Sequence, residues 1–78
     1  KINKIIKQTM NRTAVTSSNI ASIGYDEASS TLEVQFTNGS TYQYFNIPQG
    51  VYKGLMGAGS HGEYLAQNVK GIYRYSKV

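Results

Sequence analysis

Two runs of alternating side chains around Asn38-Gly39 constrain the fold of this chain more than any other feature. In residues 31–36 and 41–44, apolar or aromatic side chains alternate with polar ones. This period of two is typical of strands that are buried on one face. Asn-Gly is a strong turn signal between such runs. The sequence therefore predicts a β-hairpin over residues 31–47.

The length of the hairpin loop decides which side chains share a face. A two-residue loop in a type I′ turn would place the tyrosines on the face of Glu33 and mix polar with apolar residues. A three-residue loop, with Gly39 left-handed in a G1 bulge, pairs Val34 with Tyr42. We predict the three-residue loop, which leaves only Phe45 out of place. It gives one face of Leu32, Val34, Phe36, Tyr42 and Tyr44 and an opposite face of Glu33, Gln35, Thr41 and Gln43.

The segments that flank the hairpin predict a further strand and a helix. Residues 20–25 alternate, so we expect a strand with Ala21, Ile23 and Tyr25 on one face. Pro48 favours the first position of a helix, because its φ angle is already helical and its missing N–H is unbonded there in any case. Three glycines recur at intervals of four and three in that helix, which predicts a face that lies close to the sheet or to a neighbouring helix: Gly50, Gly54 and Gly57.

A second short helix and a last strand are expected near the C-terminus. Ser60 and Glu63 have the spacing of a capping box, in which the Ser60 side chain accepts from the N3 amide and Glu63 bonds back to the Ser60 amide. The helix should run to about Val69, with Gly71 as its left-handed end. Residues 72–78 alternate and predict a final strand. The fold class is therefore α+β: an antiparallel meander of three to four strands with two short helices on one face.

The chain of 78 residues is long enough for one domain only. We place this domain at residues 10–78. Residues 1–9 form an N-terminal extension or linker, either as a short amphipathic helix or as the tail of an upstream segment. The start at Lys1 rather than at a methionine is consistent with a processed or excised piece of a longer polypeptide.

The composition argues against several classes of site. There is no cysteine, so disulfides and thiolate metal sites are excluded. No apolar run approaches the ~18 residues of a membrane span, and we expect a cytoplasmic protein without membrane association, metal or cofactor. Ser60, His61 and Glu63 resemble a triad on paper. However, side chains one or two positions apart on a helix do not face each other, so capping is the favoured interpretation and we expect no enzyme activity.

The basic residues and tyrosines indicate a binding function instead. The net charge is +4, and two basic regions flank an acidic middle, which is typical of proteins with an anionic partner. Aromatic rings beside cations can stack on bases while the charges hold phosphates. The alternative is that the C-terminal tyrosines belong to the core and the cations are only solvated. The candidate nucleic-acid-binding residues are Lys53, Lys70, Tyr73, Arg74, Tyr75 and Lys77.

Several motifs together resemble the KTSC domain. They are residues 17–26 (SSNIASIGYD), residues 32–36 (LEVQF), residues 60–64 (SHGEY) and residues 72–75 (IYRY), with Pro48 and Tyr52 between them. The family is named for its occurrence at the C-terminus of some lysyl-tRNA synthetases, and it also occurs as free-standing bacterial and phage proteins. The resemblance implies an accessory module that contacts nucleic acid, RNA first of all. The alternative is a protein-interaction or oligomerisation module that regulates a larger, phage-related partner or an upstream domain through the sheet face around Phe45.

Overall fold

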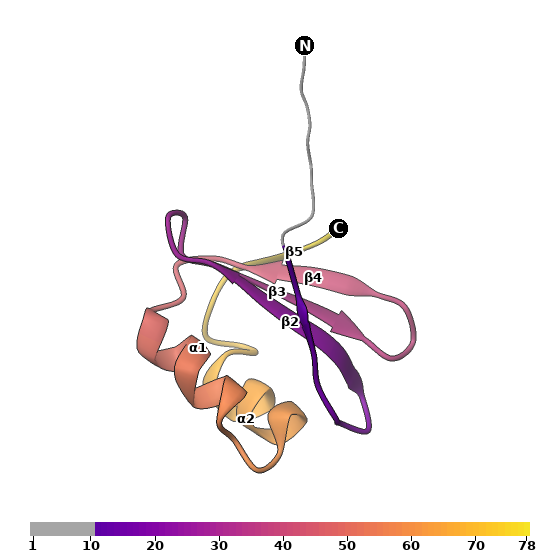
Figure 1. The fold of residues 1–78 in the computed structure, drawn as a ribbon. Coiled ribbons are helices and arrows are strands. Elements are labelled where there is room, and N and C mark those ends of the chain that lie inside the picture. The colour runs from indigo at the N-terminus through magenta and orange to yellow at the C-terminus, as the bar shows by residue number, and fades with distance from the viewer. Residues whose placement is uncertain (1–10) are drawn as a thin grey trace.

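The computed structural model describes residues 11–78 and has the predicted α+β class. Five antiparallel strands form one sheet in sequential order, and both helices lie on one face of it (Figure 1). The expected extension at residues 1–9 and the expected domain start at Met10 lie outside the described residues. The elements are β1 (Thr13–Ala14), β2 (Ile20–Asp26), β3 (Thr31–Phe36), β4 (Thr41–Tyr44), α1 (Gln49–Met56), α2 (His61–Asn68) and β5 (Tyr75–Lys77).

The β3–β4 hairpin has the predicted register. Leu32 lies opposite Tyr44, and Val34 lies opposite Tyr42. The amide of Phe36 donates to the carbonyl of Ser40 at 2.8 Å, and the amide of Gly39 donates back to the carbonyl of Phe36 at 2.9 Å. Gly39 has a φ angle of 95°, a left-handed conformation that glycine adopts without a steric penalty. The three-residue loop with a G1 bulge is thus confirmed.

Strand β2 departs from the simple alternation. Ile20 lies opposite Phe36 but Ser22 lies opposite Gln35, so Ala21 is an extra residue in a β-bulge. The bulge brings Ile20 to the same face as Ile23, and both side chains are fully buried. The predicted face of Ala21, Ile23 and Tyr25 is therefore wrong at its first position. An uninterrupted period of two cannot show an inserted residue.

Helix α1 begins one residue later than predicted. Pro48 has an extended ψ angle of 148° and acts as the N-cap, and its carbonyl accepts from the amides of Val51 and Tyr52 at 3.0 and 3.3 Å. The predicted glycine face is correct only at Gly54, where a Cβ atom would lie 2.2 Å from the Tyr64 hydroxyl of α2. Gly54 thus lets the tyrosine ring of one helix lie directly on the backbone of the other.

Helix α2 begins after its predicted cap, Ser60, and ends at Asn68, one residue before the predicted end. The Ser60 hydroxyl accepts from the Glu63 amide at 3.3 Å. Within residues 11–78, no reciprocal hydrogen bond from the Ser60 amide to the Glu63 carboxylate is formed, so only half of the predicted capping box is present. Val69 is the C-cap, so Gly71, with a φ angle of 78°, lies two residues beyond the cap and is not the C′ residue that the sequence predicted. No helix in this part of the chain is long and apolar enough to cross a membrane.

One apolar core joins the sheet to the helices. Tyr25 on β2 stacks on Tyr52 of α1 at 4.7 Å between ring centroids, and its hydroxyl donates to the Ile47 carbonyl at 2.6 Å. This contact fastens the entry of α1 to the sheet. The fully or nearly fully buried members of the core are Ile20, Ile23, Leu32, Val34, Tyr44, Ile47, Leu55, Leu65 and Val69.

The outer face of the sheet carries a buried charge that the sequence did not reveal. Glu33, which alternation places on a solvated face, is fully buried. Its carboxylate pairs with Arg12 and accepts from Gln43 Nε2 at 2.9 Å. Arg12 Nε also donates to the Ser22 hydroxyl at 3.0 Å, so Arg12 bridges β2 and β3. Phe45, expected to be exposed on the sheet, is half-buried.

Candidate functional site

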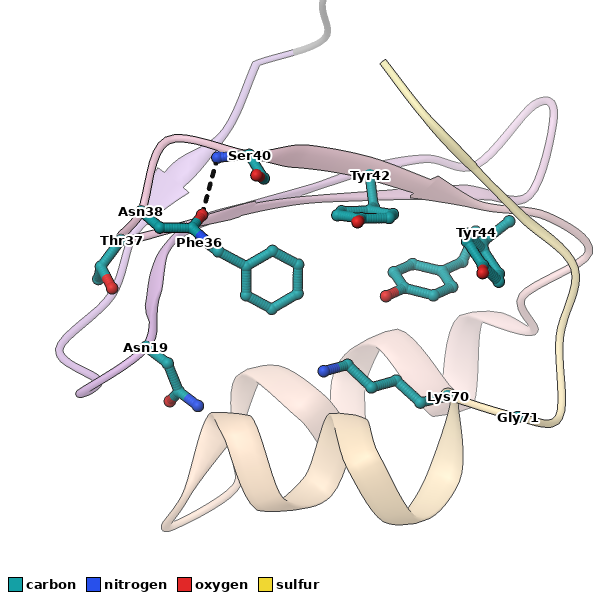
Figure 2. Close-up of a pocket in the computed structure, with 10 residues that line it drawn as sticks. Asn19, Phe36, Thr37, Asn38, Ser40, Tyr42, Tyr44, Lys70 and Gly71 are labelled. Carbon is teal, nitrogen blue, oxygen red and sulfur yellow. Dashed lines mark hydrogen bonds between the residues drawn. The ribbon is translucent and has the colours of Figure 1, made fainter.

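An aromatic groove of about 600 Å³ lies between the sheet and the C-terminal end of α2 (Figure 2). Its upper side is the β3–β4 hairpin, and its lower side is the turn that leaves α2. The volume lies within the ~300–1,000 Å³ range of small-molecule sites. The lining residues of the aromatic groove are Asn19, Phe36, Thr37, Asn38, Ser40, Tyr42, Tyr44, Lys70, Gly71 and Tyr75.

Four rings form a continuous wall of this groove. Phe36 meets Tyr42 edge to face at 5.7 Å, and Tyr42 is followed by Tyr44 at 6.4 Å. Tyr75 of β5 adds a fourth ring at 5.7 Å from Tyr42 and 5.9 Å from Tyr44. The wall exists because the register places Leu32, Tyr44 and Tyr75 side by side across three strands. Aromatic side chains therefore continue the core face to the last strand.

Exposure changes along this wall. Tyr44 is only 3% exposed, whereas Tyr75 is 62% exposed. Burial raises the pKa of the Tyr44 hydroxyl above its usual value of 10.0, and the neighbouring hydroxyls of Tyr42 and Tyr75 raise this pKa further. The Tyr44 ring is thus neutral at physiological pH. The inner end of the wall is part of the core, and the outer end is available to a ligand.

Lys70 lies across the groove from these rings. Its Nζ atom is 5.1 Å from the centre of the Phe36 ring, within the range of a cation–π contact. No carboxylate of residues 11–78 lies within salt-bridge distance of Lys70. An ammonium group that faces aromatic rings without a carboxylate partner can bind an anionic group on a ligand.

The structure brings together two of the predicted binding residues, Lys70 and Tyr75, in the aromatic groove. Tyr73 is half-buried and packs against the core, while it also lines a second, shallower hollow of about 400 Å³ with Arg74 and Tyr75. Lys77 lies opposite Tyr42 in the β4–β5 pairing and so shares the face of the wall.

Lys53 is separate from this group. It lies in the last turn of α1 and lines neither hollow. Lys53 was predicted to bind with the others only because it is basic. Charge alone does not show where a residue lies in the folded domain.

Sequence reasoning missed other groove residues. It assigned Phe36, Tyr42 and Tyr44 to the core face by alternation, and it gave Asn19 no role in binding. An aromatic ring can satisfy the alternation of a core face and still expose one side. The available signal was the number of aromatic residues, since seven tyrosines are more than two short helices can cover.

Charge within the described domain gathers beside the groove. Residues 11–78 contain five basic and four acidic side chains, a net charge of +1, and Arg12 is already paired with Glu33. Residues 70–78 contain Lys70, Arg74 and Lys77 and no acidic residue. The basic character of the domain is therefore local, on the segment that closes the aromatic groove.

The groups that line the aromatic groove are suited to binding. Residues 11–78 contain no group of three histidine, aspartate or glutamate side chains that could hold a metal ion. Ser60 caps α2, as predicted, and its hydroxyl accepts from the backbone amide of Glu63. What the site offers is a set of rings, an ammonium group and nearby cations.

Comparisons with known proteins place the chain in a family. The KTSC domain model matches residues 16–75. An uncharacterized protein of Stutzerimonas stutzeri (strain A1501) is 39% identical over 70 residues, which cover 88% of this chain and 99% of the relative. A lysine–tRNA ligase of Nostoc punctiforme is 31% identical over 59 residues, which cover 76% of this chain but only 10% of the ligase. The crystal structure of a KTSC domain protein from Yersinia pestis matches with a TM-score of 0.84 and 39% identity, over 90% of this chain and 99% of that one. The chain therefore belongs to the KTSC domain family.

Proposed function

We propose that this KTSC domain is a non-catalytic accessory module that binds single-stranded nucleic acid, in particular RNA, through the aromatic groove. The observation that carries the proposal is the placement of Lys70 opposite a wall of rings whose outer member, Tyr75, is largely exposed. Bases stack on such rings while cations hold the phosphates between them.

The neighbouring cations extend this arrangement along a strand of nucleotides. Arg74 lines the adjoining hollow, and Lys77 shares the face of the wall. A single strand could thus place one base in the groove and pass its backbone along β5. The relation to a short region of a lysine–tRNA ligase supports an accessory role beside an RNA-binding enzyme.

The direct test is a fluorescence titration of the domain with a labelled single-stranded RNA decamer at several salt concentrations. If three cations contact phosphates, the logarithm of the binding constant should fall with the logarithm of salt with a slope of about −2. Exchange of Arg74 and Lys77 for glutamate should abolish binding, because it removes two contacts and adds repulsion.

The single exchange Lys70→Glu should also weaken binding strongly, and Lys53→Glu is its matched control, since it makes the same change of charge on an exposed side chain outside both hollows. It should leave most of the affinity intact. An equal loss in Lys53→Glu and in Lys70→Glu would mean that overall charge, and not the groove, determines binding.

A protein-interaction role is the second candidate. Three large apolar side chains of the C-terminal segment are largely exposed: Ile72 by 62%, Tyr75 by 62% and Val78 by 61%. An apolar contact with a protein partner would respond little to salt, so the same titration separates the two functions.

A further inference from the structure

The aromatic groove contains a polar side chain at the end opposite Lys70. Figure 2 shows Asn19 and Lys70 approaching the space beneath the Phe36 ring from opposite ends. Both residues line the same hollow. A base that lies against the rings would therefore have an ammonium group at one end and a side-chain amide at the other.

Asn19 is exposed, and two contacts hold it at this end of the groove. Its backbone carbonyl accepts from the Thr37 amide at 3.0 Å, which ties it to the hairpin loop. Its side chain lies against Gly62 in the first turn of α2, where a Cβ atom would be 2.8 Å from Asn19 Oδ1. Glycine at position 62 thus leaves the room that the amide occupies.

The two ends of this amide differ in their partners. Asn19 Oδ1 faces the hydroxyls of Ser18 and Ser17 at 3.3 and 3.5 Å. Asn19 Nδ2 has no hydrogen-bond partner among residues 11–78. The Nδ2 donors of this amide are thus the group that it offers first to a ligand, since Oδ1 already faces two hydroxyl donors.

We propose that Asn19 is a specificity-determining residue that makes the groove prefer keto bases, uracil and guanine, over amino bases, cytosine and adenine. This inference rests on the proposed function. Uracil and guanine present a carbonyl oxygen at the ring position where cytosine and adenine present an amino group. The Asn19 Nδ2 donor can bond the carbonyl, whereas an amino group placed there would meet a second donor and leave both unpaired.

The test is a comparison of U10 and C10 RNA decamers, whose bases have the same size and differ in this group. The domain should bind U10 roughly 5-fold more tightly than C10, the effect of about one hydrogen bond. Asn19→Asp replaces the donor by an acceptor, so the ratio should reverse in favour of C10, although both affinities fall from the added negative charge. A thermal melt checks that this variant is folded.

Asn38→Asp is the matched control. Asn38 also lines the groove, but its Oδ1 atom accepts from the Ser40 amide at 2.9 Å, a bond that an aspartate keeps. It adds the same charge at the same groove and should weaken both decamers equally, with the preference for U10 retained.

The outcomes separate the inference from the proposed function. Equal binding of U10 and C10 by the unchanged domain overturns the role of Asn19 and leaves nucleic-acid binding intact; this measurement needs no variant. Reversal in Asn38→Asp as well as in Asn19→Asp would also overturn it. If the unchanged domain binds neither decamer at low salt, the proposed function itself is wrong.

Discussion

Both faces of the sheet are fully buried at their centre, but different kinds of side chain cover them. Leu32 and Glu33 are neighbours on β3, point to opposite faces, and are both fully buried. Leu32 is covered by the apolar side chains of the helix side. Glu33 is covered by Arg12, a residue from the segment before β1, and by Gln43. One face is thus closed by hydrophobic packing that any apolar surface could supply, and the other by one specific ion pair.

The largest expected effect comes from the helix side. Leu32→Ala should lower the free energy of unfolding by about 3 kcal/mol, because it removes buried methyl groups and leaves a cavity. A domain of this size has only roughly 4–12 kcal/mol of stability, so urea denaturation should show a marked drop in midpoint. Thr41→Ala, on the other face of the same sheet and half-buried, is the control and should change little. A loss below about 1 kcal/mol in Leu32→Ala would show that the helices do not seal this face.

The ion pair on the outer face should have an intermediate effect. Arg12→Ala leaves the Glu33 carboxylate without its cation and should cost about 2 kcal/mol, less than a fully enclosed pair because Arg12 is partly exposed. The measurement is again urea denaturation, with Thr13→Ala, an exposed neighbour in β1, as the control.

A double variant distinguishes the charge from the packing. If the loss arises from an unpaired buried charge, Arg12→Met combined with Glu33→Leu should recover most of the stability, since apolar pairs often replace buried ion pairs at no cost. If the double variant is as unstable as Arg12→Ala, the loss does not come from an unpaired buried charge. The outer face would then not depend on the ion pair.

The smallest expected effect is a loss of stability at alkaline pH, which should arise from Tyr44 on the helix side of the sheet. The pKa of Tyr44 is raised in the folded domain, so folding favours its protonated form. The stabilisation is fully present below the unfolded value of about 10 and is lost as pH rises through the raised pKa. Thermal melts between pH 8 and 11 should show a decline in melting temperature that is smaller in Tyr44→Phe. An identical decline in both proteins would assign the effect to other groups.

The sequence predicted the parts of this fold that rest on local signals. Alternation and one glycine determined the hairpin register, and the Ser60 cap determined the start of α2. The bulge at Ala21 could not be predicted, because it is visible only in the pairing of β2 with β3. The Arg12–Glu33 pair could not be predicted either, because its partners are 21 residues apart in the chain.

The candidate site was predicted only in part for a similar reason. Lys70 and Tyr75 stood out by charge and aromatic character along the chain. The rings of Phe36 and Tyr42 join them only after three strands are aligned, and Asn19 joins through the loop that precedes β2. Which residues line the groove depends on how the strands are assembled, so no local sequence pattern indicates it.

The lengths of the outermost strands have a consequence for how the domain behaves at high concentration. The sheet ends in β1, with two residues, and in β5, with three, the last of which is Lys77. Long flat strands in these positions would act as templates for further chains and lead to aggregation. Two or three residues offer too few unpaired backbone groups to hold another strand, and a charged side chain opposes it further. Copies of the domain that are held close together can therefore remain separate.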